Sequence, residues 1–198
     1  LGDPGSGLPV TMPFPAEMYV DYIRVYEWNG QGDVHLGPPE FESGVFGLYT
    51  EETPVTGELI PEVSSMIYVW EGTLVGGSIP PYEGDNVLSW QTAGLGWFGA
   101  GIMAAQPLNL FDFGSGHLKF RIKIPADVTF KIGIIHAWDN QQYVEFPAHQ
   151  TTYGLVRDGE WGQAAIPIGD LRGTLIDLRM LSYAFVILEE QGTACEVA

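Results

Sequence analysis

The segment from Trp138 to Tyr143 gathers side chains that can hold a sugar. It reads Trp-Asp-Asn-Gln-Gln-Tyr, so two aromatic rings flank one acid and three amides. Sugar rings offer apolar C–H faces that stack on flat side chains, and a rim of hydroxyl groups that carboxylates and amides can bond. The pattern therefore favours a ligand of this chemistry, with Trp138 and Tyr143 as platforms. An ordinary polar hairpin explains the same residues and stays open.

The other tryptophans divide between candidate site and candidate core. Trp97 lies among four glycines, so its ring either faces outward as a further platform or caps the domain. Trp70 and Trp90 each end a predicted strand, and we expect them in the core. Trp161 follows a turn and fits either place.

Charged side chains interrupt several apolar strings at alternate positions, and alternate residues of a strand share one face. Between Leu118 and Ile124, for example, each basic residue stands between two apolar ones. If the strands lie side by side, the charges form one outward face that can bond a sugar chain. This predicted face carries Arg121, Lys131, Glu145 and Arg179, with Tyr143 and Trp138 as ring platforms.

Ion pairs between neighbouring strands are the alternative explanation of these charges. Arg121 with Glu145, or Arg179 with the nearby Asp177, would tie strands together without any ligand. Both interpretations stay open at this point.

No string in the sequence has the residue types and spacing of a catalytic centre. It contains no Gly-x-Ser-x-Gly elbow, no His-Glu-x-x-His pair and no phosphate-binding glycine loop. A retaining glycosidase needs two carboxyl groups about 5–5.5 Å apart, whereas the adjacent Glu51 and Glu52 would point to opposite faces of a strand. Cys195 is the only cysteine, so we expect a buried structural thiol. The sequence predicts a chain that is not an enzyme.

Among metal ions, the sequence argues against zinc and leaves a structural calcium ion open. The four histidines are scattered, unlike the ligands of a zinc site. A structural calcium ion stays open, because calcium takes carboxylate and carbonyl oxygens and Glu40, Glu42, Glu51 and Asp139 could supply them. No cofactor is expected to be required.

The charge of the chain excludes two classes of partner. With 25 acidic and 8 basic residues, the formal net charge is -17. Such a field repels nucleic acid and anionic membrane surfaces, and no apolar run approaches the ~20 residues of a membrane span. Apart from Arg24, every basic residue lies between Lys119 and Arg179, where a local cluster could serve a neutral ligand.

Short apolar strings separated by Gly and Pro turns predict an all-β chain, an antiparallel two-sheet β-sandwich of jelly-roll type. One helical turn at most is expected, at Gly169–Arg172. The predicted strands are Val45–Tyr49, Met66–Trp70, Asn86–Trp90, Phe98–Met103, His117–Ile124, Thr129–Trp138, Tyr143–Phe146, Gln163–Ile168, Leu175–Glu189 and Ala194–Val197.

The N-terminal string resembles the closing strand of another kind of domain. Residues 14–26 read Phe-Pro-Ala-Glu-Met-Tyr-Val-Asp-Tyr-Ile-Arg-Val-Tyr, which is similar to the end of family-16 glycoside hydrolases of the laminarinase and agarase type. The resemblance implies a strand remnant of a catalytic domain at 1–28 and a Gly/Pro linker at 29–43. The paired Glu and Asp signature of that family is absent from this chain, so the remnant implies no activity here.

Residues 44–198 resemble the accessory carbohydrate-binding β-sandwich that follows such hydrolases in bacteria. The resemblance is carried by strings such as Gly-Trp-Phe-Gly-Ala-Gly-Ile at 96–102, Tyr-Val-Glu-Phe-Pro-Ala at 143–148 and Tyr-Gly-Leu-Val-Arg-Asp-Gly-Glu-Trp at 153–161. It implies a secreted, non-catalytic module that binds a β-glucan or an algal galactan and brings its attached hydrolase to that polysaccharide. A fragment of an endo-glycosidase and a structural cell-surface spacer are the alternatives.

Overall fold

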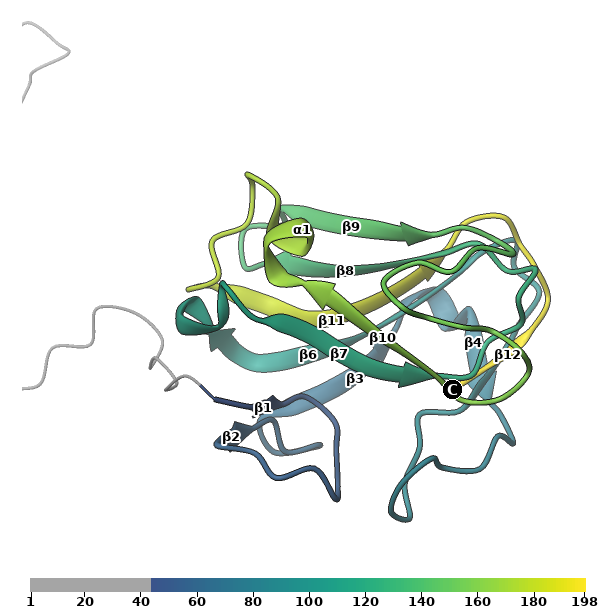
Figure 1. Ribbon diagram of the computed structural model, residues 1–198, viewed down its shortest axis with the longest axis horizontal. Coiled ribbons are helices and arrows are strands. Elements are labelled where there is room, and N and C mark those ends of the chain that lie inside the picture. Colours follow the sequence, from purple (N-terminus) through teal and green to yellow (C-terminus); the bar gives the residue numbers. More distant parts are fainter. Residues whose placement is uncertain (1–43) are drawn as a thin grey trace, which may run out of the picture. The chain divides into compact units, whose positions relative to one another are not determined.

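A computed structural model describes residues 44–198, and its main element is a five-stranded antiparallel sheet (Figure 1). The strands lie in the order β3-β6-β11-β8-β9. Their bounds are β3 Ser65–Val69, β6 Phe98–Leu108, β8 Phe130–His136, β9 Gln141–Phe146 and β11 Leu181–Glu189. The predicted hydrolase remnant at 1–28 and the linker at 29–43 lie outside the described residues, so those boundaries stay predictions.

Smaller sheets and short helices complete the fold. A pair of antiparallel strands, β7 (His117–Ile122) and β10 (Gly162–Pro167), lies over one face of the large sheet (Figure 1). The remaining elements are β1 Phe46–Gly47, β2 Gly57–Glu58, β4 Leu74–Gly76, β5 Trp90–Thr92, β12 Glu196–Val197, the 3-10 turns η1 Trp70–Gly72 and η2 Phe111–Phe113, and the helix α1 Ile168–Arg172. The predicted all-β sandwich is confirmed.

Aromatic and aliphatic side chains fill the space between the large sheet and the β7–β10 pair. Phe120 of β7 points inward, and its ring centroid lies 5.5 Å from that of Phe185 on β11. On the large sheet, the rings of Phe130 and Phe146 stack with their centroids 4.8 Å apart. In β7 and β8 alternation explains this arrangement, since every second residue of these two strands is apolar and faces the core.

Several predicted strands are shorter in the structure: Val45–Tyr49 is a strand only at Phe46–Gly47, Asn86–Trp90 only at Trp90, and Ala194–Val197 only at Glu196–Val197. The string Leu175–Glu189 becomes a strand only from Leu181. Asp177 Oδ1 accepts a hydrogen bond from the Arg179 backbone N–H at 3.0 Å, a local turn that competes with strand pairing. Ile176 and Leu178 lie in this turn and are buried. Apolar side chains therefore do alternate toward the core here, although the segment is not a strand.

Within residues 44–198, no helix is long and apolar enough to cross a membrane.

Candidate functional site

A single row of residues crosses the outer face of the five-stranded sheet, the face turned away from β7 and β10. The strand pairing aligns one residue from each strand, because Gly101 pairs with Tyr68 and Val186, and Gly133 pairs with Val186 and Tyr143. At ~4.8 Å between neighbouring strands, the row spans about 19 Å. Its members in spatial order are Tyr68, Gly101, Val186, Gly133 and Tyr143.

The glycines of this face let aromatic rings pack closely against the sheet. A Cβ atom on Gly101 would lie 2.8 Å from Tyr183 Cδ1 and 3.1 Å from Trp70 Cη2, and one on Gly133 would lie 2.5 Å from Tyr143 Cε1. The rings therefore occupy the space of the missing side chains. Val186 lies between the two glycines and is only 1% exposed, so neighbouring side chains cover the middle of the row.

Five rings form this surface, which we term the aromatic strip: Tyr68, Trp70, Trp97, Tyr143 and Tyr183. The ring centroids of Trp70 and Tyr183 are 5.4 Å apart at an interplanar angle of 32°, and Tyr68 meets Trp70 edge-on at 5.5 Å. Trp97 belongs to the group because its Cζ3 lies 3.0 Å from the position of a Cβ on Gly99, beside Trp70 Cε3 at 3.1 Å.

The rings are held partly out of water. Burial raises the pKa of the Tyr143 phenol, and the charge of Glu190 raises it further. Burial also raises the pKa of Tyr183, with a smaller contribution from Tyr68. Yet Tyr68 remains 42% exposed, and the other four rings are half-buried. The strip therefore combines fixed rings with apolar surface that a ligand can cover.

A buried threonine fixes the position of Trp70. Thr73 donates its hydroxyl hydrogen to the Trp70 carbonyl at 2.9 Å and accepts a hydrogen bond from the Gly99 N–H at 3.1 Å. The chain turns sharply after Trp70, with positive φ at Glu71 and Gly72. The 3-10 turn η1 is thereby tied to β6, and the indole ring lies over the glycines of that strand.

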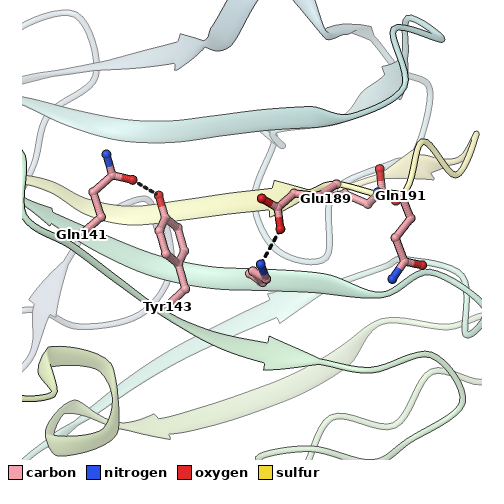
Figure 2. Close-up of polar contacts among 6 residues, drawn as sticks. Gln141, Tyr143, Glu189 and Gln191 are labelled. Carbon is pink, nitrogen blue, oxygen red and sulfur yellow. Dashed lines mark hydrogen bonds and ion pairs between the residues drawn. The ribbon is translucent and has the colours of Figure 1, made fainter.

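A polar hollow lies at the β8–β9–β11 end of the strip. It has a volume of about 150 Å³, and Lys131, Glu145, Glu190 and Gln191 contribute its polar lining. Lys131 forms an ion pair with Glu190. On the same face, the Tyr143 hydroxyl donates a hydrogen bond to Gln141 Oε1 at 2.8 Å (Figure 2).

The loop that closes this hollow is anchored by Glu189. This carboxylate is 1% exposed and accepts hydrogen bonds from the backbone N–H groups of Gln191, Gly192 and Thr193, at 2.8, 3.0 and 3.2 Å. These three hydrogen bonds offset the free-energy cost of burying the Glu189 carboxylate. Glu189 thus positions Glu190 and Gln191 beside the strip.

Replacing Glu189 by alanine should lower the free energy of unfolding by about 1–3 kcal/mol, because the loop N–H groups lose their acceptor. Urea denaturation measures the change. Glu190→Ala is the matched control, since this neighbouring side chain is exposed and should change stability by less than about 0.5 kcal/mol. Equal stability of the two variants would contradict the anchoring role.

Four of the residues predicted from sequence meet on this outer face. Trp97 and Tyr143 belong to the aromatic strip, and Lys131 and Glu145 line the polar hollow. Lys131 is aligned with Glu145 across the strands, but its ion pair is with Glu190. The sequence therefore identified the end of the face at the polar hollow and, apart from it, the ring of Trp97 beside Trp70.

Arg121 and Arg179 do not lie on this face, so the predicted single charged surface is wrong. Arg121 belongs to β7, in the opposite layer, where its guanidinium lies 3.8 Å from the ring centroid of Tyr82. An Arg121–Glu145 tie is excluded for the same reason. Arg179 lies in the turn before β11, 3.6 Å from the ring centroid of Phe111, and its Nη1 is 3.4 Å from Asp177 Oδ1.

Trp138 lies at the hairpin between β8 and β9 rather than in the strip. Its side chain is 75% exposed, and its ring meets His136 edge-on at 5.1 Å. The predicted hairpin is present, with a hydrogen bond of 2.8 Å from the His136 N–H to the Asn140 carbonyl. Whether Trp138 contacts a ligand stays a prediction.

Sequence reasoning missed three rings of the strip: Tyr68, Trp70 and Tyr183. Trp70 was assigned to the core because it ends a predicted strand. A usable signal was present in the alternation of Met66, Tyr68 and Trp70, which places three large side chains on one face. For Tyr183 no such signal exists, because irregular pairing of β11 decides its face.

Of the four candidate calcium ligands, the structure describes only Glu51 and Asp139, so the question of a structural calcium ion stays open. Within residues 44–198, no three His, Cys, Asp or Glu side chains gather where they could hold a metal ion. Glu51 instead accepts hydrogen bonds from the backbone N–H groups of Asp85 and Asn86, at 2.7 and 2.9 Å, and from the Asn86 side chain. These bonds lower the pKa of Glu51, the Asn86 side chain contributing most. Glu40 and Glu42 lie outside the described residues.

The thiol of Cys195 agrees with the expected structural role. It packs against the core, and burial, with the charges of Glu189 and Asp127, raises its pKa to about 11. A thiol with so high a pKa is a poor nucleophile at neutral pH.

No protein-family model and no curated protein matches this chain. Among solved structures, it is similar to a family 30 carbohydrate-binding module of a cellulosomal cellulase of Clostridium thermocellum. The TM-score is 0.52 at 17% identity, over 66% of this chain and 80% of that one. Two further family 30 modules match with TM-scores of 0.52 and 0.51 and identities of 17% and 16%, over 66% of this chain and 72% and 86% of theirs. These similarities establish a shared β-sandwich fold and lend no support to a family-16 catalytic domain.

Proposed function

We propose that this module binds a polysaccharide chain along the aromatic strip and does not cleave it. The cross-strand row carries the proposal, since two of its glycines make room for aromatic rings packed against the sheet. Aromatic rings held in place on the sheet offer apolar surface to the C–H faces of successive sugar units, and the adjacent polar groups can bond their hydroxyls.

The shape of the site favours a chain over a single sugar. An open row of about 19 Å gives several shallow contacts instead of one deep pocket, so the affinity should be modest. We expect dissociation constants of roughly 10 μM to 1 mM, or about -4 to -7 kcal/mol. A β-glucan or an algal galactan is the proposed ligand, and the fold shared with modules described as carbohydrate-binding supports this class of ligand.

We propose further that the module belongs to a secreted bacterial enzyme and brings a family-16 hydrolase to its polysaccharide. The support is the string Phe14–Tyr26, which resembles the end of such a catalytic domain. A longer protein that carries this hydrolase upstream should degrade insoluble polysaccharide faster than its catalytic domain alone.

Affinity electrophoresis tests the binding function. The chain should be retarded in gels that contain at least one of laminarin, curdlan, mixed-linkage glucan, agarose or porphyran, and incubation with that polysaccharide should release no reducing ends. Reducing ends would identify an enzyme. Unretarded migration in every gel would favour a structural spacer and overturn the proposal.

A further inference from the structure

The polar hollow at the end of the aromatic strip is a subsite rather than a complete binding site. Its volume of about 150 Å³ is below the ~300–1,000 Å³ typical of pockets that enclose a whole small molecule. Because Lys131 and Glu145 belong to the same outer face as Tyr143, a chain stacked on the Tyr143 ring would bring its next unit to this hollow.

The charges of the hollow do not balance. Lys131 is its only cation and is paired with Glu190. Glu145 is aligned with Lys131 across the strands, but its carboxylate has no hydrogen-bond or ion-pair partner among residues 44–198. The side chain is exposed, so a ligand can reach it. The hollow therefore presents one uncompensated negative charge to a bound chain.

A free carboxylate accepts hydrogen bonds and donates none. The hydroxyl groups of a neutral sugar supply the donors that Glu145 and Glu190 accept, while the Lys131 ammonium donates to a hydroxyl or ring oxygen. A carboxylate or sulfate on the sugar would supply no donor, and it would meet the negative charge of Glu145 at close range.

We propose that this subsite makes the module selective for neutral polysaccharides and against chains with carboxylate or sulfate groups. The inference rests on the proposed function, because it requires a chain on the aromatic strip. It goes beyond the overall charge of -17, since it assigns the discrimination to Glu145 at one end of the strip.

The test compares a neutral glucan that the chain binds with a carboxymethylated preparation of the same glucan. In affinity electrophoresis at low salt, the full chain should bind the neutral form more tightly, and salt should narrow the difference because it screens charge. Glu145→Gln should reduce the neutral-to-carboxymethyl affinity ratio by about fourfold, the effect of one unit charge ~5 Å away in a water-like medium.

Glu58→Gln is the matched control. It removes the same charge from an exposed position on β2, and it should leave the affinity ratio unchanged. Equal binding of both glucans by the parent chain would overturn the inference, and so would equal changes in the two variants, which would indicate net charge alone. Retardation by the sulfated porphyran alone would overturn the inference but not the proposed function, whereas unretarded migration in all five gels would overturn the proposed function itself.

Discussion

Replacing Trp70 by alanine should remove polysaccharide binding while the domain stays folded. Trp70 is the central large ring of the strip, in contact with Tyr68 and Tyr183. Central aromatic residues of binding surfaces commonly contribute 2 kcal/mol or more, so affinity should fall at least about 30-fold and move beyond detection for a ligand this weak. Because the ring is half-buried rather than fully buried, we expect unfolding to become easier by only about 1–2 kcal/mol.

Trp161→Ala is the control for Trp70→Ala. Trp161 is equally half-buried, but it packs edge-on against Tyr82, beside Arg121 of the opposite layer. Its loss should leave affinity for the polysaccharide unchanged. Trp138→Ala, at the hairpin, should have a smaller effect than Trp70→Ala. Full binding by a folded Trp70→Ala variant would exclude the strip as the site.

Replacing Gly101 by alanine should damage binding by moving two rings at once. The new methyl group would lie 2.8 Å from Tyr183 Cδ1, 3.0 Å from the Phe185 carbonyl oxygen and 3.1 Å from Trp70 Cη2. Overpacking of this kind costs about 1–3 kcal/mol of stability, and the displaced rings lose their positions against the sheet. Thermal unfolding measures the loss of stability, tryptophan fluorescence the displacement of Trp70, and affinity electrophoresis the loss of binding.

Gly76→Ala separates this effect from the general effect of replacing a strand glycine. Gly76 lies in β4, and a Cβ there would meet no atom within 4 Å. Its substitution should leave fluorescence and binding as in the parent chain. If Gly101→Ala also keeps the parent affinity and fluorescence, the glycines do not support the rings.

The sequence by itself determined the elements of this fold. Apolar alternation between Gly and Pro turns predicts ten strands, and each overlaps a strand in the structure, although two short strands, β2 and β4, were missed. Alternation is a local property, fixed by the geometry of a single strand. Because alternation is local, it correctly placed Arg121 and Lys131 on the outward side of their own strands.

Only the tertiary structure decided that these are two different faces. Strand order is set by packing between segments distant in the chain, and it places β7 over the large sheet instead of within it. Irregular pairing in β11 has the same kind of effect on Tyr183 and Phe185. Two residues apart, they would share a face in a regular strand, but the shift in register between them turns Tyr183 onto the strip and Phe185 into the core. A bulge inserts one residue without a partner, and the pattern of side chains alone does not reveal where it falls.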